Sequence, residues 1–364
     1  MMDKEKLLTL IRELTALPGG AGREQAVAAY MAEAFRRYAS RVEADAVGNV
    51  YAFFGQGERK VMVSAHTDEV GMFVKYINDQ GYIYFEANGI LDERVLLDTK
   101  VEVITGDGTV HVGVIGIKSR HLMTPEELAR PVNIGDLWLD VGADSAADVA
   151  AMGIRVGDPI VYRRHFDLLA GGRFTCKAID DRAGCAVLLA VAEAMAAEPL
   201  PYTLCLVATA QEEIGSRGAK VAAQRLKPDI ALCLDTVPAA DPYTPPQQSA
   251  ARLGGGPVIR SADFLSHAML GAVYSAKIVR GLRGAAEEAG IPYQEDVFRT
   301  WTDAATVAYS GEGVPSGGIF MPRRCSHAPV EVADIGDIAN TAALLDAYLR
   351  RLTANAVGDL TKFF

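Results

Sequence analysis

Histidine and carboxylate side chains follow several apolar segments of this sequence, and both residue types bind divalent metal ions in proteins. They are His66 and Asp68 after VMVSA, Glu212 and Glu213 after TLCLVATA, Asp235 directly after IALCL, and His327 just beyond GIFMP. Asp180 and Asp181 come immediately before a helix that the sequence predicts from Arg182. In open α/β sheets, ligand sites gather outside the carboxyl ends of the strands. We therefore expect these side chains to share one edge of a sheet.

Each of these pieces also has a purely structural explanation. A His-x-Asp pair after a strand is often a hydrogen-bonded surface pair, and adjacent glutamates are often solvated. Asp180-Asp181 could act as a helix N-cap, and Asp235 could begin a turn. A single histidine such as His327 is often structural. The combination is more specific, because carboxylates clustered at one sheet edge would repel one another without a compensating cation.

The number of candidate ligands predicts two metal ions. Five residues are available, and one bridging carboxylate would give three protein ligands to each ion: His66, Asp180, Glu213, Asp235 and His327. A ligand set of imidazole and carboxylate groups without a thiolate favours Zn²⁺, with Co²⁺ or Mn²⁺ as alternatives. Two such ions would clamp and polarise a bridging water. Asp68 is expected to contact the outer nitrogen of the His66 ring, and Glu212 is expected to take the proton from that water.

The elements that must position these residues alternate between strand and helix. Predicted strands cover 50–54, 61–65, 203–209, 230–234, 293–298 and 318–321, and predicted helices cover 4–15, 24–38, 182–197, 216–225, 275–290, 304–310 and 335–352. This alternation predicts an α/β fold, a mixed sheet flanked by helices on both faces.

A second block interrupts this pattern. Residues 72–165 contain β-like runs separated by Gly, Asp and Asn turns, with short helices predicted only at 124–129 and 146–152. We expect a discontinuous catalytic α/β domain formed by residues 1–71 and 166–364, with a small β-barrel-like domain, residues 72–165, inserted into it.

The motifs around these residues resemble those of the cytosolic glutamyl aminopeptidases and tetrahedral (TET) metallo-aminopeptidases, some of which are labelled endoglucanases. The matching segments, in order, are LPGGAGRE, DAVGNV, AHTDEVG, CKAIDDRAG, TAQEEIGSRGA, LDT, LGGGPVI, WTDAA and RRCSHAPVE. They cover nearly the whole chain. Cys325 departs from the family pattern, in which a tyrosine is common two residues before the histidine.

This resemblance implies a zinc-exopeptidase-like fold and assigns the ligands. It implies that His66, Asp180 and Asp235 hold one metal, and that Asp180, Glu213 and His327 hold the other. Asp180 would be the bridge and Glu212 the general base. It also implies that the inserted domain mediates dimerisation within a dodecamer, so a homo-oligomer is expected.

Several other polar features have simpler interpretations. Gly254-Gly255-Gly256-Pro257 lacks the residues of a phosphate loop, and we expect it and the segment after Asp235 to form part of the cleft wall. Thr302-Asp303 is expected to cap a helix, and a role in the site is the alternative. The remaining histidines have no partner pattern and are expected to be structural or exposed: His111, His121, His165 and His267.

Composition excludes several classes of partner. The 364 residues carry 36 Lys+Arg and 46 Asp+Glu, a formal charge of −10, which argues against nucleic acid and against an anionic membrane surface. Half of the residues are hydrophobic, but we expect no membrane span and no secretory signal. The five cysteines show no C-x-x-C spacing, and Cys205 and Cys233 lie in apolar runs, which favours a reducing cytoplasm.

The sequence thus predicts a dinuclear aminopeptidase that removes N-terminal residues from short peptides. Three alternatives remain open at this point. The same metal site could serve a deacylase or carboxypeptidase. The family's endoglucanase label suggests a glycoside hydrolase, although sugar cleavage uses two flanking carboxylates. The chain could also be a non-catalytic assembly protein.

Overall fold

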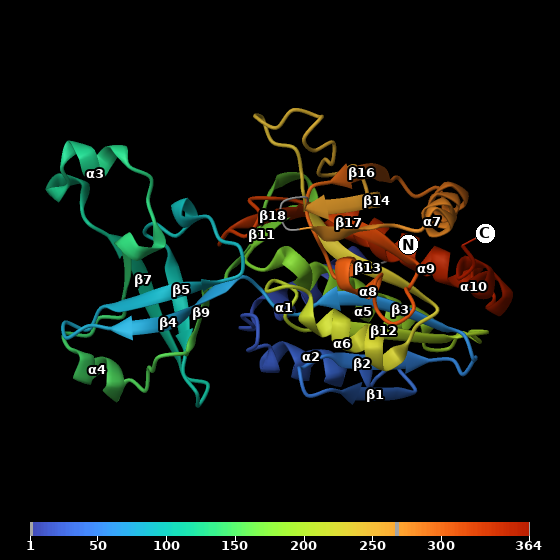
Figure 1. Cartoon of the computed structure of the whole chain (residues 1–364), viewed down its shortest axis with the longest axis horizontal. Coiled ribbons are helices and arrows are strands. Elements are labelled where there is room, and N and C mark those ends of the chain that lie inside the picture. The colour runs from blue at the N-terminus through green and yellow to red at the C-terminus, as the bar shows by residue number, and fades with distance from the viewer. Residues whose placement is uncertain (1–2, 266–268, 364) are drawn as a thin grey trace.

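The computed structural model describes residues 3–265 and 269–363, and two bodies can be distinguished in it (Figure 1). The larger body is a mixed sheet with the strand order β1-β2-β12-β3-β13-β17-β18-β11-β10, and β14, β15 and β16 attach to it beside β17. The strands of this body are β1 (Arg41–Ala44), β2 (Val50–Phe54), β3 (Lys60–His66), β10 (Phe166–Leu168), β11 (Arg173–Cys176), β12 (Thr203–Thr209), β13 (Ile230–Pro238), β14 (Val258–Leu265), β15 (Leu270–Val273), β16 (Gln294–Phe298), β17 (Ser316–Arg324) and β18 (Glu331–Asp334). The predicted mixed α/β sheet is confirmed.

Helices cover both faces of this sheet. On one face α5 packs against α1, α2 and α9, and on the other α6 packs against α8. The helices are α1 (Lys4–Thr15), α2 (Gln25–Phe35), α5 (Ile179–Met195), α6 (Arg217–Leu226), α7 (Ala276–Ala289), α8 (Ala304–Val307), α9 (Ile335–Arg351) and α10 (Ala354–Leu360). Nearly every residue of α5 is buried, as its apolar composition on all sides requires.

The central strands β12, β3, β13 and β17 run parallel to one another. Their sequences are almost uniformly apolar because helices cover both faces, and Cys205 and Cys233 are buried among them as predicted. The carboxyl ends of these four strands therefore meet at one edge of the sheet.

The second body is a closed barrel with the strand order β4-β5-β8-β7-β6-β9, seen at the left of Figure 1. Its strands are β4 (Gly71–Ile77), β5 (Ile83–Asn88), β6 (Lys100–Ile104), β7 (Val110–Ile117), β8 (Leu137–Asp140) and β9 (Pro159–Tyr162). Short helices lie around it: η1 (Glu93–Val95), η2 (Arg120–Leu122), α3 (Pro125–Ala129), η3 (Ile134–Asp136) and α4 (Ala146–Ala151), while η4 (Ala170–Gly172) follows it in the chain. The inserted β-rich block is thus confirmed as a separate barrel. The exact domain boundaries stay a prediction.

Several elements were not predicted from the sequence. β1 and β10 are short edge strands without a clear alternation of burial. β14 carries Arg260 and Asp263 at buried positions, which hides its strand pattern. Among the described residues, no helix is both long and apolar enough to span a membrane.

Candidate metal centre

Parallel strand ends bring the predicted residues together. His66 is the last residue of β3, Asp235 lies in β13, and Glu213 follows β12. His327 follows β17, and Asp180 lies at the start of α5. These five residues and Glu212 line one pocket of about 550 Å³, including its open mouth. The convergence expected from strand-end positions is therefore present.

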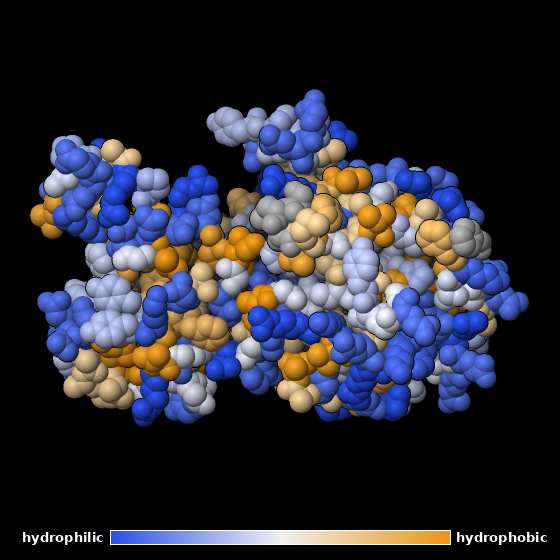
Figure 2. Space-filling model, in the orientation of Figure 1, coloured by the Kyte–Doolittle hydropathy of each residue, from blue (hydrophilic) through white to orange (hydrophobic). Residues whose placement is uncertain are grey.

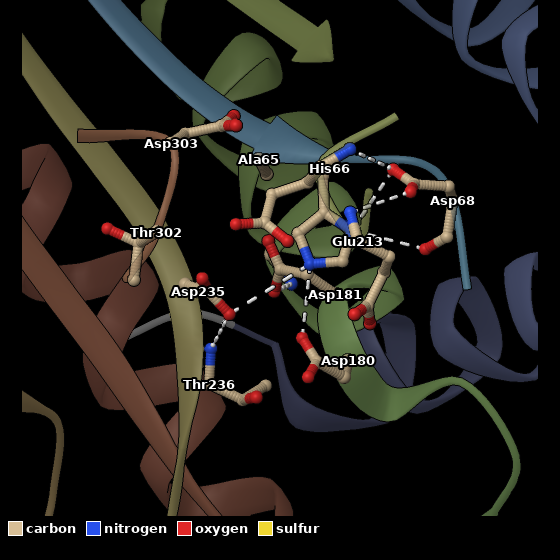
Figure 3. A network of polar contacts seen from close by, with 12 residues as sticks. Ala65, His66, Asp68, Asp180, Asp181, Glu213, Asp235, Thr236, Thr302 and Asp303 are labelled. Carbon is tan, nitrogen blue, oxygen red and sulfur yellow. Dashed lines mark hydrogen bonds and ion pairs between the residues drawn. The ribbon is translucent and has the colours of Figure 1, made fainter. Parts of the chain in front are cut away.

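His66 lies at the centre of the contacts (Figure 3). Its Nε2 atom is 3.1 Å from Asp180 Oδ1 and 4.0 Å from Asp235 Oδ1. On the other side of Asp180, His327 Nε2 is 3.3 Å from Asp180 Oδ2 and 3.4 Å from Glu213 Oε1. Ligand atoms of His66, Asp180 and Glu213 all lie within 4.8 Å of one another, close enough to hold one ion.

The two adjacent aspartates have different roles. Asp181 is fully buried, and its Oδ1 atom accepts a hydrogen bond of 2.9 Å from the N–H of Gly184. The backbone of Asp180 and Asp181 is not helical, so helical geometry begins at Arg182, as the sequence predicted. Asp181 therefore caps α5, and Asp180 is free to face the site.

Three carboxyl groups of the pocket have raised pKa values, those of Glu212, Glu213 and Asp235. Burial, reinforced by neighbouring carboxylates, raises the pKa of Glu212 and of Asp235 well above the ordinary range. Burial and the charge of Asp180 raise the pKa of Glu213 to about 7. A cluster of acids with raised pKa values is a site at which a bound cation would stabilise the charged forms.

The pKa values of Asp180 and of the two histidines shift in the directions that ion pairing produces. Burial alone would raise the pKa of Asp180, but Arg323, His327 and His66 hold it well below its usual value. Burial opposes the charged imidazoles, yet contacts with Asp180 and Asp68 keep the pKa of His66 well above its ordinary value. Glu213 and Asp180 similarly outweigh burial and raise the pKa of His327 to about 9. These pKa shifts favour a charged Asp180 carboxylate paired with protonated His66 and His327.

Asp68 contacts main-chain N–H groups as well as the His66 ring. Its carboxylate is 3.5 Å from Nδ1 of His66, but its main-chain oxygen lies closer to that atom, at 3.1 Å. The two carboxylate oxygens instead accept hydrogen bonds from the N–H groups of Glu212, at 2.9 Å, and Glu213, at 3.0 Å. Asp68 therefore positions the Glu212-Glu213 segment as well as the His66 ring.

Two further side chains accept hydrogen bonds from the main chain just before Glu212. Oε1 of Glu24 accepts a hydrogen bond of 3.1 Å from the N–H of Gln211, and Oδ1 of Asn49 accepts one of 2.9 Å from Ala210. Gln211 has a positive φ of 60°, which a side chain rarely adopts, so these contacts hold an unusual turn. The result is a fixed backbone just before Glu212.

The pocket wall contains further residues beside the predicted ligands. Besides the expected polar groups, it is lined by Ile90, Thr236, Pro238, Phe298, Thr300, Trp301, Thr302, Arg323 and Ser326. The segment after Asp235 contributes as predicted, through Thr236 and Pro238. Phe298 ends a strand that was predicted and Trp301 follows it, but nothing in the sequence indicated which way these two side chains face.

Two structural expectations were wrong. The segment 254–258 is absent from the pocket lining, because the N–H groups of Gly254 and Gly256 both donate to the Asp337 carboxylate, each at 2.7 Å. Asp303 does not cap its helix with its side chain, because that carboxylate accepts a hydrogen bond of 2.7 Å from the Thr209 hydroxyl. His121 is exposed as predicted, whereas His267 lies outside the described residues.

Similarity to known proteins extends over most of the chain. Residues 48–344, well over half of the chain, match the family model described as M42 glutamyl aminopeptidase. SgcX of Escherichia coli (strain K12) is 34% identical, covering 90% of this chain and 89% of its own. The glutamyl aminopeptidase of Lactococcus lactis subsp. cremoris (strain MG1363) is 29% identical, covering 98% of this chain and 100% of its own.

Solved structures are also similar over nearly the full length. Aminopeptidase APDkam598 from the archaeon Desulfurococcus kamchatkensis is 36% identical with a TM-score of 0.93, covering 98% of each chain. The Pyrococcus horikoshii TET1 peptidase is 28% identical with a TM-score of 0.85, covering 95% of this chain and 100% of that one. That peptidase can assemble into a tetrahedron or a large octahedral shell.

Proposed function

The chain belongs to the M42 glutamyl aminopeptidase family, and we propose that it removes N-terminal residues from short peptides with two divalent metal ions and Glu212 as general base. Family membership makes it a peptidase. The observation that carries the finer proposal is the convergence of two histidines and four acids in one pocket.

Two ligand sets that share Asp180 support the proposed pair of ions. Oδ1 of Asp180 faces His66, which in turn lies near Asp235, while Oδ2 faces His327, which lies near Glu213. A carboxylate whose two oxygens face different imidazoles is suited to bridge two ions. We assign His66, Asp180 and Asp235 to one position and Asp180, Glu213 and His327 to the other.

The chemistry of the donor set fits divalent ions. Oε1 of Glu213 is buried 3.4 Å from Nε2 of His327 and accepts no hydrogen bond among the described residues, so it can accept a further ligand. Imidazole and carboxylate donors favour Zn²⁺, with Co²⁺ and Mn²⁺ as alternatives. Bound ions would neutralise the carboxylates and act as Lewis acids on the peptide carbonyl.

Glu212 is placed to move a proton. It lines the pocket, and its Oε1 atom accepts a hydrogen bond of 3.2 Å from the Ser216 hydroxyl, which orients the carboxyl group. Burial raises its pKa, so the group can accept a proton from the attacking water and then donate it to the leaving amine. The hydrogen bond from the Glu212 N–H to Asp68 fixes the main chain of Glu212 in position for this transfer.

Replacing Glu212 tests this assignment. Glu212→Gln keeps the shape and the Ser216 contact but cannot accept the proton, so we expect unchanged metal content and a kcat lower by about 10²–10⁴-fold. Amino-acyl p-nitroanilides and their N-acetylated forms should be compared, since an aminopeptidase requires the free amine. Turnover close to that of the unaltered protein would remove Glu212 from this role.

The same assay separates the alternatives. Cleavage of N-acetylated substrates would indicate a deacylase or other amidohydrolase, and release of C-terminal residues would indicate a carboxypeptidase. Activity on β-glucan that survives a chelator would indicate a glycoside hydrolase. Metal binding without hydrolysis of any peptide would favour a non-catalytic assembly protein.

We further propose that the barrel contacts a second copy of this chain, within a dodecamer built from dimers. Apolar side chains are exposed on its strands, among them Tyr76, Val112 and Val114, and Figure 2 shows apolar patches on the barrel within a largely hydrophilic surface. A mass measurement in solution would test the assembly. We expect a cytoplasmic protein that acts on peptides, without nucleic acid or membrane as partner.

A further inference from the structure

A buried arginine lies among the carboxylates of the candidate metal centre. Arg323, in β17, is 3% exposed and lines the pocket. Its Nε atom donates a hydrogen bond of 2.6 Å to the Thr236 hydroxyl, its Nη1 atom is 3.2 Å from Glu331 Oε1, and its Nη2 atom contacts Asp180 Oδ2 directly. A guanidinium group keeps its charge under all ordinary conditions, so this is a permanent cation within the site.

The hydrogen bond that Arg323 donates to Asp180 goes to Oδ2. Oδ2, which Arg323 contacts, is the oxygen that faces His327, while Oδ1 faces His66. Arg323 and His327 therefore share Oδ2 of Asp180, while the Nε atom of Arg323 is held by Thr236 beside Asp235.

Neighbouring groups hold the arginine in this place. Glu331 is buried beside it, and its carboxylate also accepts hydrogen bonds from the N–H groups of Asp180, at 3.2 Å, and His327, at 2.9 Å. The Arg323 guanidinium is thus paired on two sides and fixed by Thr236 on a third. Such a group is not displaced without loss of several contacts.

From this asymmetry we propose that Arg323 makes the two metal positions unequal, because it competes with a divalent ion for Oδ2 of Asp180. The position of His66 and Asp235 fills first and retains its ion. The position of Glu213 and His327 binds more weakly and exchanges its ion. This inference rests on the proposed two-ion function and adds to it an order of filling that is set by a residue outside the ligand set.

Two forces act in the same direction. The ligand oxygen already has a charged partner, which an incoming ion must displace or share. The fixed guanidinium also repels a divalent ion at close range, and burial weakens the screening by solvent. Removal of the arginine charge removes both effects, and leaves Asp180 and Glu331 with uncompensated negative charge.

Zinc titration of the metal-free full-length protein against a chromophoric chelator tests this inference. In the unaltered protein we expect two binding steps whose dissociation constants differ at least tenfold. Arg323→Met should tighten the second step about tenfold or more and leave the first nearly unchanged. Arg323→Lys keeps the charge and should keep the second step weak. Arg324→Met is the matched control, since alternation along the strand turns that side chain to the other face.

Three outcomes would overturn the inference: two equal steps in the unaltered protein, an unchanged second step in Arg323→Met, or a weaker one. The last result would mean that the arginine orients Asp180 as a ligand. Crystals grown with one equivalent of zinc provide a test without any variant, because the ion should lie beside His66 and Asp235; an ion found first beside His327 contradicts the inference. Absence of zinc binding in every protein would instead reject the proposed function.

Discussion

The Nδ1 atom of His327 lies 2.8 Å from the main-chain oxygen of Ile90. His327 lies between β17 and β18 of the main sheet, and Ile90 follows β5 of the barrel, so the inserted body contacts the candidate metal centre directly. A histidine that donates from Nδ1 presents Nε2 as its ligand atom. The Tyr162 hydroxyl, at the end of β9, adds a hydrogen bond of 3.2 Å to the His327 carbonyl. The barrel thus orients a proposed ligand, whatever its role in assembly.

Displacement of the Ile90 carbonyl should therefore weaken the site. Gly89 precedes it with a φ of 107°, and a Cβ atom there would lie 2.9 Å from Cγ1 of Val70. We expect Gly89→Ala to shift this segment and reduce metal affinity and activity by about 10–100-fold, the usual effect of losing a partner of a metal-bound histidine. Zinc content after dialysis and kcat measure the effect.

Gly108→Ala is the matched control for this change. Gly108 also has a positive φ, 86°, but nothing lies within 4 Å of its added Cβ atom. Both variants introduce backbone strain into the barrel, but only the first lies beside His327. Equal losses of zinc in the two variants would show that general destabilisation of the barrel, and not the Ile90 contact, is responsible.

The second prediction concerns the hydrogen bonds that Asp68 accepts from the main chain of Glu212 and Glu213. In Asp68→Asn only one oxygen remains to accept a main-chain N–H group, and the amide nitrogen would face the N–H of Glu212 or Glu213. An unsatisfied buried donor costs about 1–3 kcal/mol, so we expect the turn to move. The kcat should fall about 10–100-fold and the free energy of unfolding should decrease, as measured by steady-state kinetics and urea unfolding.

A carboxylate at the opposite end of β3 controls for the loss of stability. Asp229 accepts a hydrogen bond of 2.7 Å from the N–H of Lys60, far along the strand from His66. Asp229→Asn should lower stability while leaving kcat nearly unchanged. A normal kcat in Asp68→Asn would mean that Asp68 does not position the catalytic segment.

Much of this site could be predicted because parallel strands place their ends together. The positions of His66, Asp235 and His327 follow from the apolar runs before them. The choice of Asp180 over Asp181 as a ligand came from the family resemblance, because the residues alone left both as a possible helix cap. Local pattern identifies which residues end a strand, and the parallel pairing then determines that they meet.

The remaining features depend on contacts between distant segments. Ile90 reaches the site through a main-chain oxygen, which no side-chain pattern records. Arg323 lies in an apolar strand where its neighbour Arg324 has the same residue type, so sequence could not show which of them is buried in the pocket. Gly254 was misassigned because a glycine run can serve a cleft wall or a main-chain contact to a carboxylate such as Asp337 equally well.

The third prediction concerns pH and rests on Glu24. Burial and the charge of Asp68 raise the pKa of this carboxyl group from 4.5 to about 7. In the unfolded chain the group loses its proton near pH 4.5, so between these two values the folded protein binds more protons. The contribution of Glu24 to stability is therefore complete below about pH 4.5 and is lost as the pH rises through about 7.

Glu24→Gln should remove this pH dependence. The Oε1 atom accepts the hydrogen bonds from both Gly22, at 2.7 Å, and Gln211, at 3.1 Å, and an amide oxygen can accept both. At about 1.4 kcal/mol per pKa unit, the variant should gain roughly 2–3 kcal/mol of stability relative to the unaltered protein between pH 4.5 and 8. Urea unfolding of both proteins in the presence of a chelator, at several pH values, measures the difference without the contribution of metal binding. Stability curves that run parallel across this range would contradict the assignment, because the burial of a titrating Glu24 requires them to diverge.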